Sequence, residues 1–290
     1  MAQQGLTAHL PATSKPTARR WGGGSGAGWL LLAPLLFLAS FLAVPVVLLA
    51  MTAVTGTGGI GSVSGDGLFV PAITRTVLMA GVVTAATTVL GTLYAIGVAA
   101  APRWAAGLLL GALFLTLWTS VLVRSFGWVL LELPTGALYQ LLHAVGLRDE
   151  PLNIYQTTLA PYPAMVQVML PFAVLPVHVA IGRLDGLQIR AARLFGASTP
   201  VVLRKVVLPQ LRSSIVSGGV LVFLMSLGFY VTPVLLGSPS NLTVAGLIDL
   251  EFSSANEPGT AAAMSLVLLA AVLILYLVAD RLLNVSERWG

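Results

Sequence analysis

Long apolar runs, separated by shorter polar stretches, make up most of the chain. A helix crosses a hydrocarbon core of about 30 Å with about 20 residues, because each residue advances it by about 1.5 Å. The runs therefore predict an all-α membrane protein with six transmembrane helices in one domain over residues 29–281. The expected spans are residues 29–54, 76–101, 105–131, 164–181, 213–237 and 259–279.

The two ends of the chain are expected outside this domain. Residues 1–28 are rich in Gly, Ser, Thr and Pro, which predicts a disordered tail, and residues 282–290 are expected to form a second, short tail. A cleaved signal peptide is the alternative interpretation of the first apolar run. The apolar core of a signal peptide has about 7 to 15 residues, and the run over 29–54 is longer, so we expect a retained first span.

Polar stretches between the runs are expected at the membrane surfaces. Residues 55–75 predict a polar loop. Residues 132–160 predict a second loop, in which the segment GALYQLLHAVGL has the periodicity of a short surface helix. A loop between the last two spans is expected to carry Asp249 and Glu251.

The placement of charge predicts the orientation of the spans. The chain is 57% hydrophobic and only 9% charged, too apolar for a soluble domain, and its net charge is +5. With the N-terminus inside, twelve of the fifteen Lys and Arg residues fall on the cytoplasmic side and seven of the ten acids fall outside. The positive-inside rule therefore predicts that both termini are cytoplasmic. The basic balance reflects topology in a lipid bilayer, so no nucleic-acid partner is expected.

The longest polar and basic interval inside the apolar chain covers residues 185–209 and is expected in the cytoplasm, between the fourth and fifth spans. Asp185 and Gln188 have the spacing of a capping box, which predicts that a helix begins there. Gly196 suits the left-handed residue that closes a helix, and Thr199-Pro200 offers an N-cap and first-turn proline for another. The interval therefore predicts two short helices joined by a turn.

Enzymatic chemistry finds little support in the sequence. A phosphate-binding loop ends in Gly-Lys-Ser/Thr, but Lys15 and Lys205, the two lysines, precede Pro and Val. The three histidines are far apart in sequence, cysteine is absent, and no Gly-x-Ser-x-Gly segment is present. We therefore expect no metal, no cofactor and no catalytic residue in this chain.

The interval 185–209 resembles the EAA signature of permease subunits of ATP-binding cassette (ABC) importers. Arg190-Ala191-Ala192 is followed by Gly196 and then by Val206-x-Leu208-Pro209 at the family spacing. Arg190 stands where the family usually has Glu, and Val206 stands for Ile. In this family the segment is the coupling helix that docks on the ATPase. The resemblance assigns this role to Asp185, Arg190, Ala191, Ala192, Gly196, Leu208 and Pro209.

A second set of motifs is similar to permeases of the spermidine/putrescine importer type. These motifs are Trp118-Thr119-Ser120, Leu122-Val123-Arg124, Trp128, Leu170-Pro171-Phe172, Leu175-Pro176, Val231-Thr232-Pro233 and Leu235-Leu236-Gly237. The resemblance implies the type I permease fold in the bacterial inner membrane and import by alternating access. The implied partners are a cytoplasmic ATPase dimer, a second permease subunit and an extracytoplasmic solute-binding protein. A polyamine is the implied solute, and an anionic phosphonate or an amino-acid-like compound is the alternative.

Candidate pathway residues come from the third and fifth predicted spans and from the loop after the fifth. A charge within a span normally faces a cavity or a partner, which singles out Arg124. Snorkelling to the headgroups, or a structural ion pair, is its alternative role. The other candidates, for which ordinary packing or solvation is the alternative, are Trp118, Ser120, Tyr230, Thr232, Pro233, Asp249 and Glu251.

A stand-alone secondary transporter or channel is the hypothesis from another class. Such a protein usually carries paired ionisable groups near the middle of the membrane. Apart from Arg124 the predicted spans offer essentially none, which favours an importer subunit.

Overall fold

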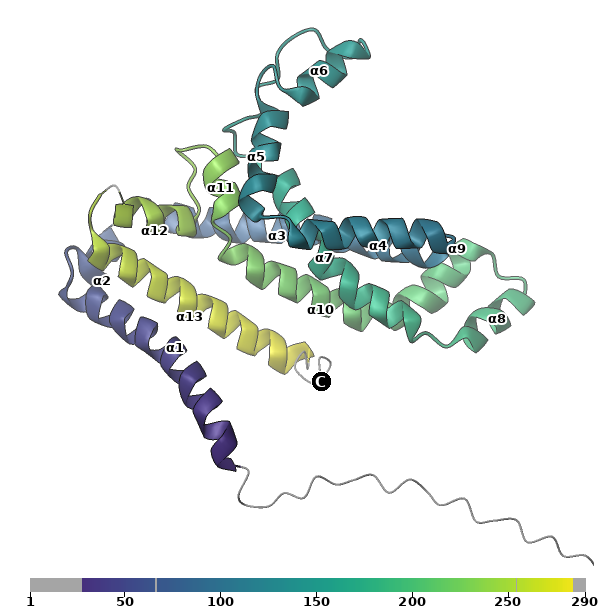
Figure 1. Cartoon of the computed structure of the whole chain (residues 1–290), viewed down its shortest axis with the longest axis horizontal. Coiled ribbons are helices and arrows are strands. Elements are labelled where there is room, and N and C mark those ends of the chain that lie inside the picture. Colours follow the sequence, from purple (N-terminus) through teal and green to yellow (C-terminus); the bar gives the residue numbers. More distant parts are fainter. Residues whose placement is uncertain (1–27, 66, 254, 284–290) are drawn as a thin grey trace, which may run out of the picture. The chain divides into compact units, whose positions relative to one another are not determined.

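The computed structural model describes residues 28–65, 67–253 and 255–283, and these residues form helices joined by connections, of which the longest covers residues 145–160 (Figure 1). The two predicted tails lie outside the described residues, except that Gly28 begins the first helix and residues 282–283 end the last one. The chain divides into two compact units, residues 1–46 and 47–290. Helix α1 (Gly28–Thr55) belongs to both, and its side chains over 32–45 are exposed, as expected of a span that faces lipid.

Within the described residues, five helices are long and apolar enough to cross a membrane, and a bent pair of helices makes a sixth span if it is counted as one. This agrees with the predicted all-α fold. The helices after α1 are α2 (Gly59–Gly65), α3 (Phe69–Ala100), α4 (Arg103–Trp118), α5 (Val121–Glu132), α6 (Ala137–Ala144), α7 (Pro161–Gly182), α8 (Gly186–Leu194), α9 (Thr199–Val202), the π-helical turn η1 (Leu203–Val207), α10 (Leu208–Leu227), α11 (Val231–Leu236), α12 (Val244–Ser253) and α13 (Pro258–Leu283).

The predicted loop over 55–75 is largely helical, which corrects the sequence prediction. It contains α2, and α3 begins at Phe69, well before the expected start at residue 76. Arg75 lies in the first two turns of α3, where its Nη1 donates a hydrogen bond to the carbonyl of Ser240 at 3.4 Å. Because this charge sits near the end of the helix and has a partner, it does not terminate the span.

The predicted third span, 105–131, is two helices rather than one. α4 and α5 meet at an angle of 104°. Thr119 and Ser120, the two residues between α4 and α5, have extended backbone. The Thr119 hydroxyl donates to the carbonyl of Leu115 at 2.8 Å. The N–H of Thr119 donates to the same carbonyl, and the helix ends where the backbone becomes extended at these two residues. In Figure 1, α5 and α6 stand across the direction of α4 and α7.

The fifth span is shifted relative to its predicted bounds of 213–237. One helical body runs from Thr199 to Leu227 through α9, η1 and α10, and it ends before Gly228. Residues 231–236, expected inside this span, form the separate helix α11. Arg204, Lys205 and Arg212 lie near the beginning of this helical body and do not end it, because long basic side chains there reach water at the membrane surface.

The loop expected around Asp249 and Glu251 contains helix α12. This helix is mainly apolar, and it is attached to α3 by Thr76, whose hydroxyl donates to the carbonyl of Ala72 at 2.8 Å and accepts from the N–H of Val244 at 2.9 Å. Thr76 is buried, so both bonds lie out of water. The two acids are therefore held on an ordered helix.

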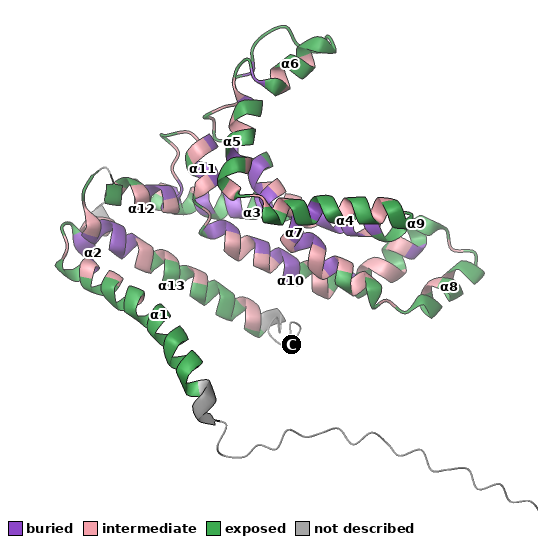
Figure 2. Ribbon diagram, viewed as in Figure 1, coloured by how far each residue is buried: buried purple, intermediate pink, exposed green. Residues whose placement is uncertain are grey.

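The core of the second unit lies where α3, α7 and α10 pack together. Close approach is possible because small residues meet there: a Cβ on Gly91 of α3 would stand 2.7 Å from the Cβ of Ala173 on α7. Met165 and Met169 of α7 and Val222 of α10 fill the centre of the same cluster. Figure 2 shows buried residues along α7 and α10, whereas α8 has none.

Candidate functional site

The predicted coupling segment begins with a capped helix. The Oδ1 of Asp185 accepts a hydrogen bond from the N–H of Leu187 at 2.9 Å, which satisfies one of the free donors in the first turn of α8. The expected capping box is only half formed. The Oε1 of Gln188 instead accepts from Gln210 of α10 at 3.2 Å, and this bond ties the start of α8 to the start of α10.

Gly196 closes α8 as the sequence predicts. Its φ of +79° lies in the left-handed region, and the N–H of Ala197 donates to the carbonyl of Ala192 at 3.0 Å. The next helix then begins one residue earlier than expected, because Ser198 rather than Thr199 is its N-cap residue. Pro200 occupies the first turn of this helix, as predicted.

The outer face of α8 is apolar and exposed. Leu194 is 87% exposed and Phe195 is 92% exposed, and Leu187 lies on the same side of the helix. Arg190 and Ala191 are also exposed, whereas Ala192 is half-buried. Large apolar side chains at such exposure are typical of a surface that another protein covers. Sequence reasoning left Phe195 out, although its position between the Ala pair and Gly196 could have indicated it.

A π-helical turn connects this segment to the fifth span. Over η1 the ladder widens, and the N–H of Leu208 donates to the carbonyl of Leu203, five residues earlier. Pro209 follows directly, has no N–H to donate, and would crowd the carbonyl four residues before it in a regular α-helix. The wider turn accommodates the proline without ending the helix. Leu208 and Pro209 therefore join the coupling segment to α10.

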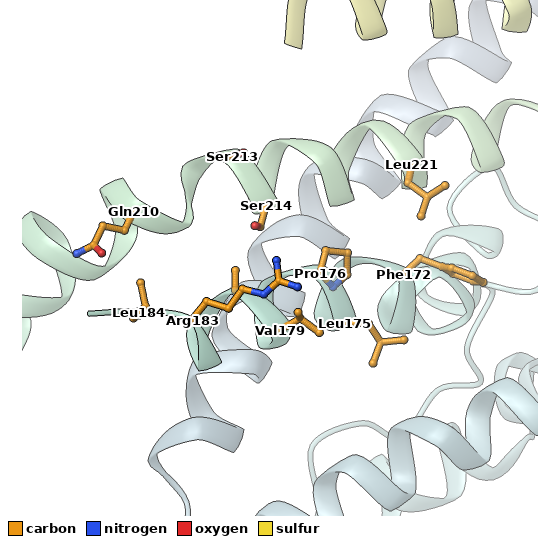
Figure 3. Close-up of a pocket in the computed structure, with 11 residues that line it drawn as sticks. Phe172, Leu175, Pro176, Val179, Arg183, Leu184, Gln210, Ser213, Ser214 and Leu221 are labelled. Atoms are coloured by element: carbon orange, nitrogen blue, oxygen red, sulfur yellow. The ribbon is translucent and has the colours of Figure 1, made fainter. Parts of the chain in front are cut away.

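A groove of about 620 Å³ runs between α7 and α10 (Figure 3). Its polar end is formed by Arg183, Gln210, Ser213 and Ser214, close to where α8 begins. The guanidinium of Arg183 turns back along the groove toward Pro176. Phe172 and Leu221 line the apolar end. Sequence reasoning missed the polar residues, because single Ser and Gln residues near the ends of spans give no pattern of their own.

The candidates of the outer part fall into two groups. Thr232 and Pro233 are buried in α11, and the Thr232 hydroxyl lies 2.9 Å from the hydroxyl of Ser125 on α5. Trp118 and Ser120 border the break between α4 and α5, and Trp118 is 88% exposed. A buried pair of hydroxyls thus joins α5 to α11, whereas Trp118, at the break between α4 and α5, is exposed.

Tyr230 and Asp249 are brought together although they are far apart in sequence. Tyr230 follows the end of α10, and Asp249 belongs to α12. Partial burial, then a hydrogen bond with Asp249 and the negative charge of that carboxylate, raise the pKa of Tyr230 above its ordinary value. The phenol therefore stays protonated at neutral pH. Glu251 lies on the same helix as Asp249, two residues further on.

Arg124 lies on α5 with its Nε and Nη1 buried and without a hydrogen-bond partner among the described residues. The structural ion pair considered for this residue is thus not formed through these two atoms. Glu132 is expected in the loop over 132–160, but it is the last residue of α5 and is only 2% exposed. Both charged groups therefore lie on the helix that follows the break in the third span.

The comparisons with known proteins agree with this architecture. The family model described as "binding-protein-dependent transport system inner membrane component" matches residues 93–289. The spermidine/putrescine transport system permease protein PotB of Escherichia coli is 31% identical over 76% of this chain and 81% of its own length. The protein of the same description from Haemophilus influenzae is 36% identical over 61% of this chain and 63% of its own length.

A solved structure shows the same fold. A bacterial ABC transporter that imports the acidic polysaccharide alginate contains a chain with a TM-score of 0.75 and 18% identity, covering 89% of this chain and 96% of that one. The EAA-like segment is typical of this family. The chain therefore belongs to the binding-protein-dependent transport system inner membrane components, as a multi-pass permease subunit of an ABC importer rather than an enzyme.

Proposed function

We propose that this permease imports polyamines such as spermidine or putrescine across the inner membrane. The similarity to the two PotB proteins, which extends over most of the chain, is the observation that carries the proposal. A polyamine is small, flexible and cationic, and it requires a path in which its charges are stabilised as water is removed.

The proposed orientation places both termini in the cytoplasm. The arrangement of the second unit supports it, because α8 and α9 lie at one end and α2 and α12 at the other (Figure 1). The α8–α10 end carries Arg183, Arg190, Arg193, Arg204, Lys205 and Arg212. The opposite end carries the acids of α12. Basic residues at one end and acidic residues at the other are the distribution that the positive-inside rule associates with a cytoplasmic coupling segment.

We propose that the exposed face of α8 docks on one subunit of a cytoplasmic ATPase dimer. Leu187, Leu194 and Phe195 would provide the apolar contact, and Gly196 would allow the chain to turn away beneath the partner. Arg190, which replaces the usual Glu, would then require an acidic or neutral counterpart on the ATPase. Asp185, Ala191 and Ala192 would maintain the helix and its close approach.

The α7–α10 groove is proposed as this subunit's share of the transport path. One wall of a path is enough in each subunit if a second permease subunit supplies the other wall. A solute-binding protein would deliver solute at the α5–α12 end, and docking of the ATPase would drive alternating access. Coupling requires that the ATPase binds the two states with different affinity, because a partner that binds both equally shifts neither.

At the outer end, Tyr230 and Asp249 are the pair best suited to contact a cation. An ammonium group is attracted both by a carboxylate and by the face of a phenol ring. Trp118, Ser120, Arg124 and Glu251 remain proposed contacts of the path. Thr232 and Pro233 are buried, and we propose that they position α11.

Uptake of labelled spermidine by cells that express the complete transport operon tests the proposal. Unlabelled putrescine, an amino acid and a phosphonate serve as competitors. We expect saturable uptake that putrescine suppresses and the other two leave unchanged. An assembled complex that hydrolyses ATP but takes up no spermidine or putrescine would exclude a polyamine as solute and leave the family assignment intact.

A further inference from the structure

Glu132 is a buried acid that neither the fold nor the coupling mechanism explains. It is 2% exposed, and its Oε2 has no hydrogen-bond partner among the described residues. Burying an ionised carboxylate costs several kcal/mol unless a cation or hydrogen-bond donors replace water around it. A free carboxylate oxygen in such a setting favours the binding of a cation or of a hydrogen-bond donor.

The direction of Glu132 follows from the residues before it on α5. Ser125, seven residues earlier, is buried and contacts Thr232 of α11. Trp128 lies one turn before Glu132, and residues four apart share one face of a helix. The indole N–H of Trp128 donates to the Oε1 of Gln167 on α7 at 2.6 Å. The face that carries Glu132 is therefore the one packed against α7 and α11.

Three chemical features lie on this face of α5. Glu132 offers a free carboxylate oxygen, Trp128 offers an aromatic ring, and the end of α5 adds the partial negative charge of its last carbonyls. A carboxylate, an indole ring and a helix C-terminus all favour a cation, and an ammonium group on an alkyl chain suits the ring and the carboxylate together.

We propose that Glu132 and Trp128 form a binding site for one ammonium group of the transported amine at the outer part of the path. The proposal rests on the proposed function as a polyamine importer and adds the residues that select the charge of the solute. Gln167 positions the indole through its hydrogen bond. Because Glu132 is covered in this structure, solute enters only after the inner face of α5 has parted from α7 and α11.

Arg124 lies two turns before Glu132 and on the same side of α5. The positive charge of Arg124 repels a second ammonium group. The site therefore holds one end of a polyamine rather than its whole length.

The test uses the purified complex with its ATPase and second permease subunit, in nanodiscs and without the binding protein. Thermal unfolding is followed with added spermidine or N-acetylputrescine and with NaCl at matched ionic strength. Ligand that binds the folded complex raises its Tm. The variants are Glu132→Gln, which keeps the shape and removes the charge, Glu132→Asp, and Glu150→Gln as a control at an exposed acid outside the proposed site.

We expect spermidine to raise the Tm of the wild type and of Glu150→Gln, and Glu132→Gln to lose this shift. Glu132→Asp should retain part of it, and the maximal rate of spermidine uptake should fall at least tenfold in Glu132→Gln. An equal spermidine shift in Glu132→Gln and the wild type would overturn the ammonium site while uptake by the wild type still supports polyamine import. A wild type that neither binds nor takes up spermidine would overturn both.

Discussion

The hydroxyls of Ser125 and Thr232 lie 2.9 Å apart in a buried contact that joins α5 to α11. Neither helix is long enough to cross the membrane alone, so this pair holds two short elements together. Hydrogen bonds between helices in membranes contribute about 0.6 kcal/mol on average and at most about 1.7 kcal/mol.

A double-mutant cycle measures this contact. Ser125→Ala and Thr232→Val are each expected to lower the stability of the complex, and the double variant should lose less than the sum, with a coupling energy of about 0.5–1.5 kcal/mol. Thr87→Val is the control, because the buried Thr87 hydroxyl has no partner in the described chain. Additive effects of the Ser125 and Thr232 changes in thermal unfolding would contradict the prediction.

A substitution at the exposed end of α8 is expected to weaken binding of the ATPase without lowering insertion of the permease into the membrane. Phe195→Ser removes a ring that contacts little in the isolated subunit, so membrane levels should stay within about twofold of the wild type. Copurification of the ATPase should fall at least tenfold, which corresponds to about 1.4 kcal/mol of binding free energy. Leu147→Ser, at a similarly exposed position between α6 and α7, is the matched control and should copurify normally.

Substitution of Gly196 is expected to lower stability through the backbone conformation at this position rather than through a steric clash of the new side chain. Nothing lies within 4 Å of a Cβ built there, but its φ is +79°. Gly196→Ala should therefore destabilise the turn by about 1 kcal/mol, and Gly196→Asn should cost less because Asn tolerates the left-handed region. Transport and ATPase binding should follow the order Gly, Asn, Ala. Equal activity of the Asn and Ala variants would argue against this explanation.

Packing between α3 and α7 predicts a contrast between two glycines of one helix. Gly91→Ala would place a Cβ 2.7 Å from the Cβ of Ala173, so the helices must separate, at a cost of about 1–3 kcal/mol. Gly81→Ala has open space and should be neutral or stabilising by up to about 1 kcal/mol. Thermal unfolding of the two variants in the assembled complex is the measurement.

The α7–α10 groove predicts a block of transport by one added ring. Ser214→Trp fills part of the groove and should lower the maximal rate of solute uptake at least tenfold, whereas ATPase copurification stays normal. Val216→Trp introduces the same ring two residues away, at an exposed position that does not line the groove. Equal uptake by the two variants would show that solute passes elsewhere.

The number and order of the apolar helices could be predicted from hydropathy, because the cost of burying charge in lipid is large and local in sequence. The ends of the helices were less predictable. Arg75 and the basic residues before Ser213 read as loop residues, yet near a span end they extend to water and leave the helix intact. The break at Thr119 and Ser120 was missed, because no Gly or Pro marks it in the sequence.

The helical pair over 185–209, the proposed coupling segment, was recognisable because its caps and its left-handed glycine are chemical requirements of a short turn. The groove and the burial of Glu132 were not, since both depend on which helix faces meet. Asp249 could be proposed from its charge alone, but its contact with Tyr230 joins residues nineteen positions apart across a helix boundary. Such contacts are set by packing rather than by local pattern.

The π-helical turn before Pro209 has a mechanical consequence. It is the one place between residues 199 and 227 where the ladder departs from regular α-helical bonding within the described chain, so it is the softest point of a stiff rod. The rod beyond it, α10, has 20 residues and a length of about 30 Å. A tilt of about 5° at the turn moves its far end by about 2.6 Å, on the order of half a helical turn. We propose that docking at α8 tilts α10 about this turn, so that movement at one side of the membrane is transmitted to the other.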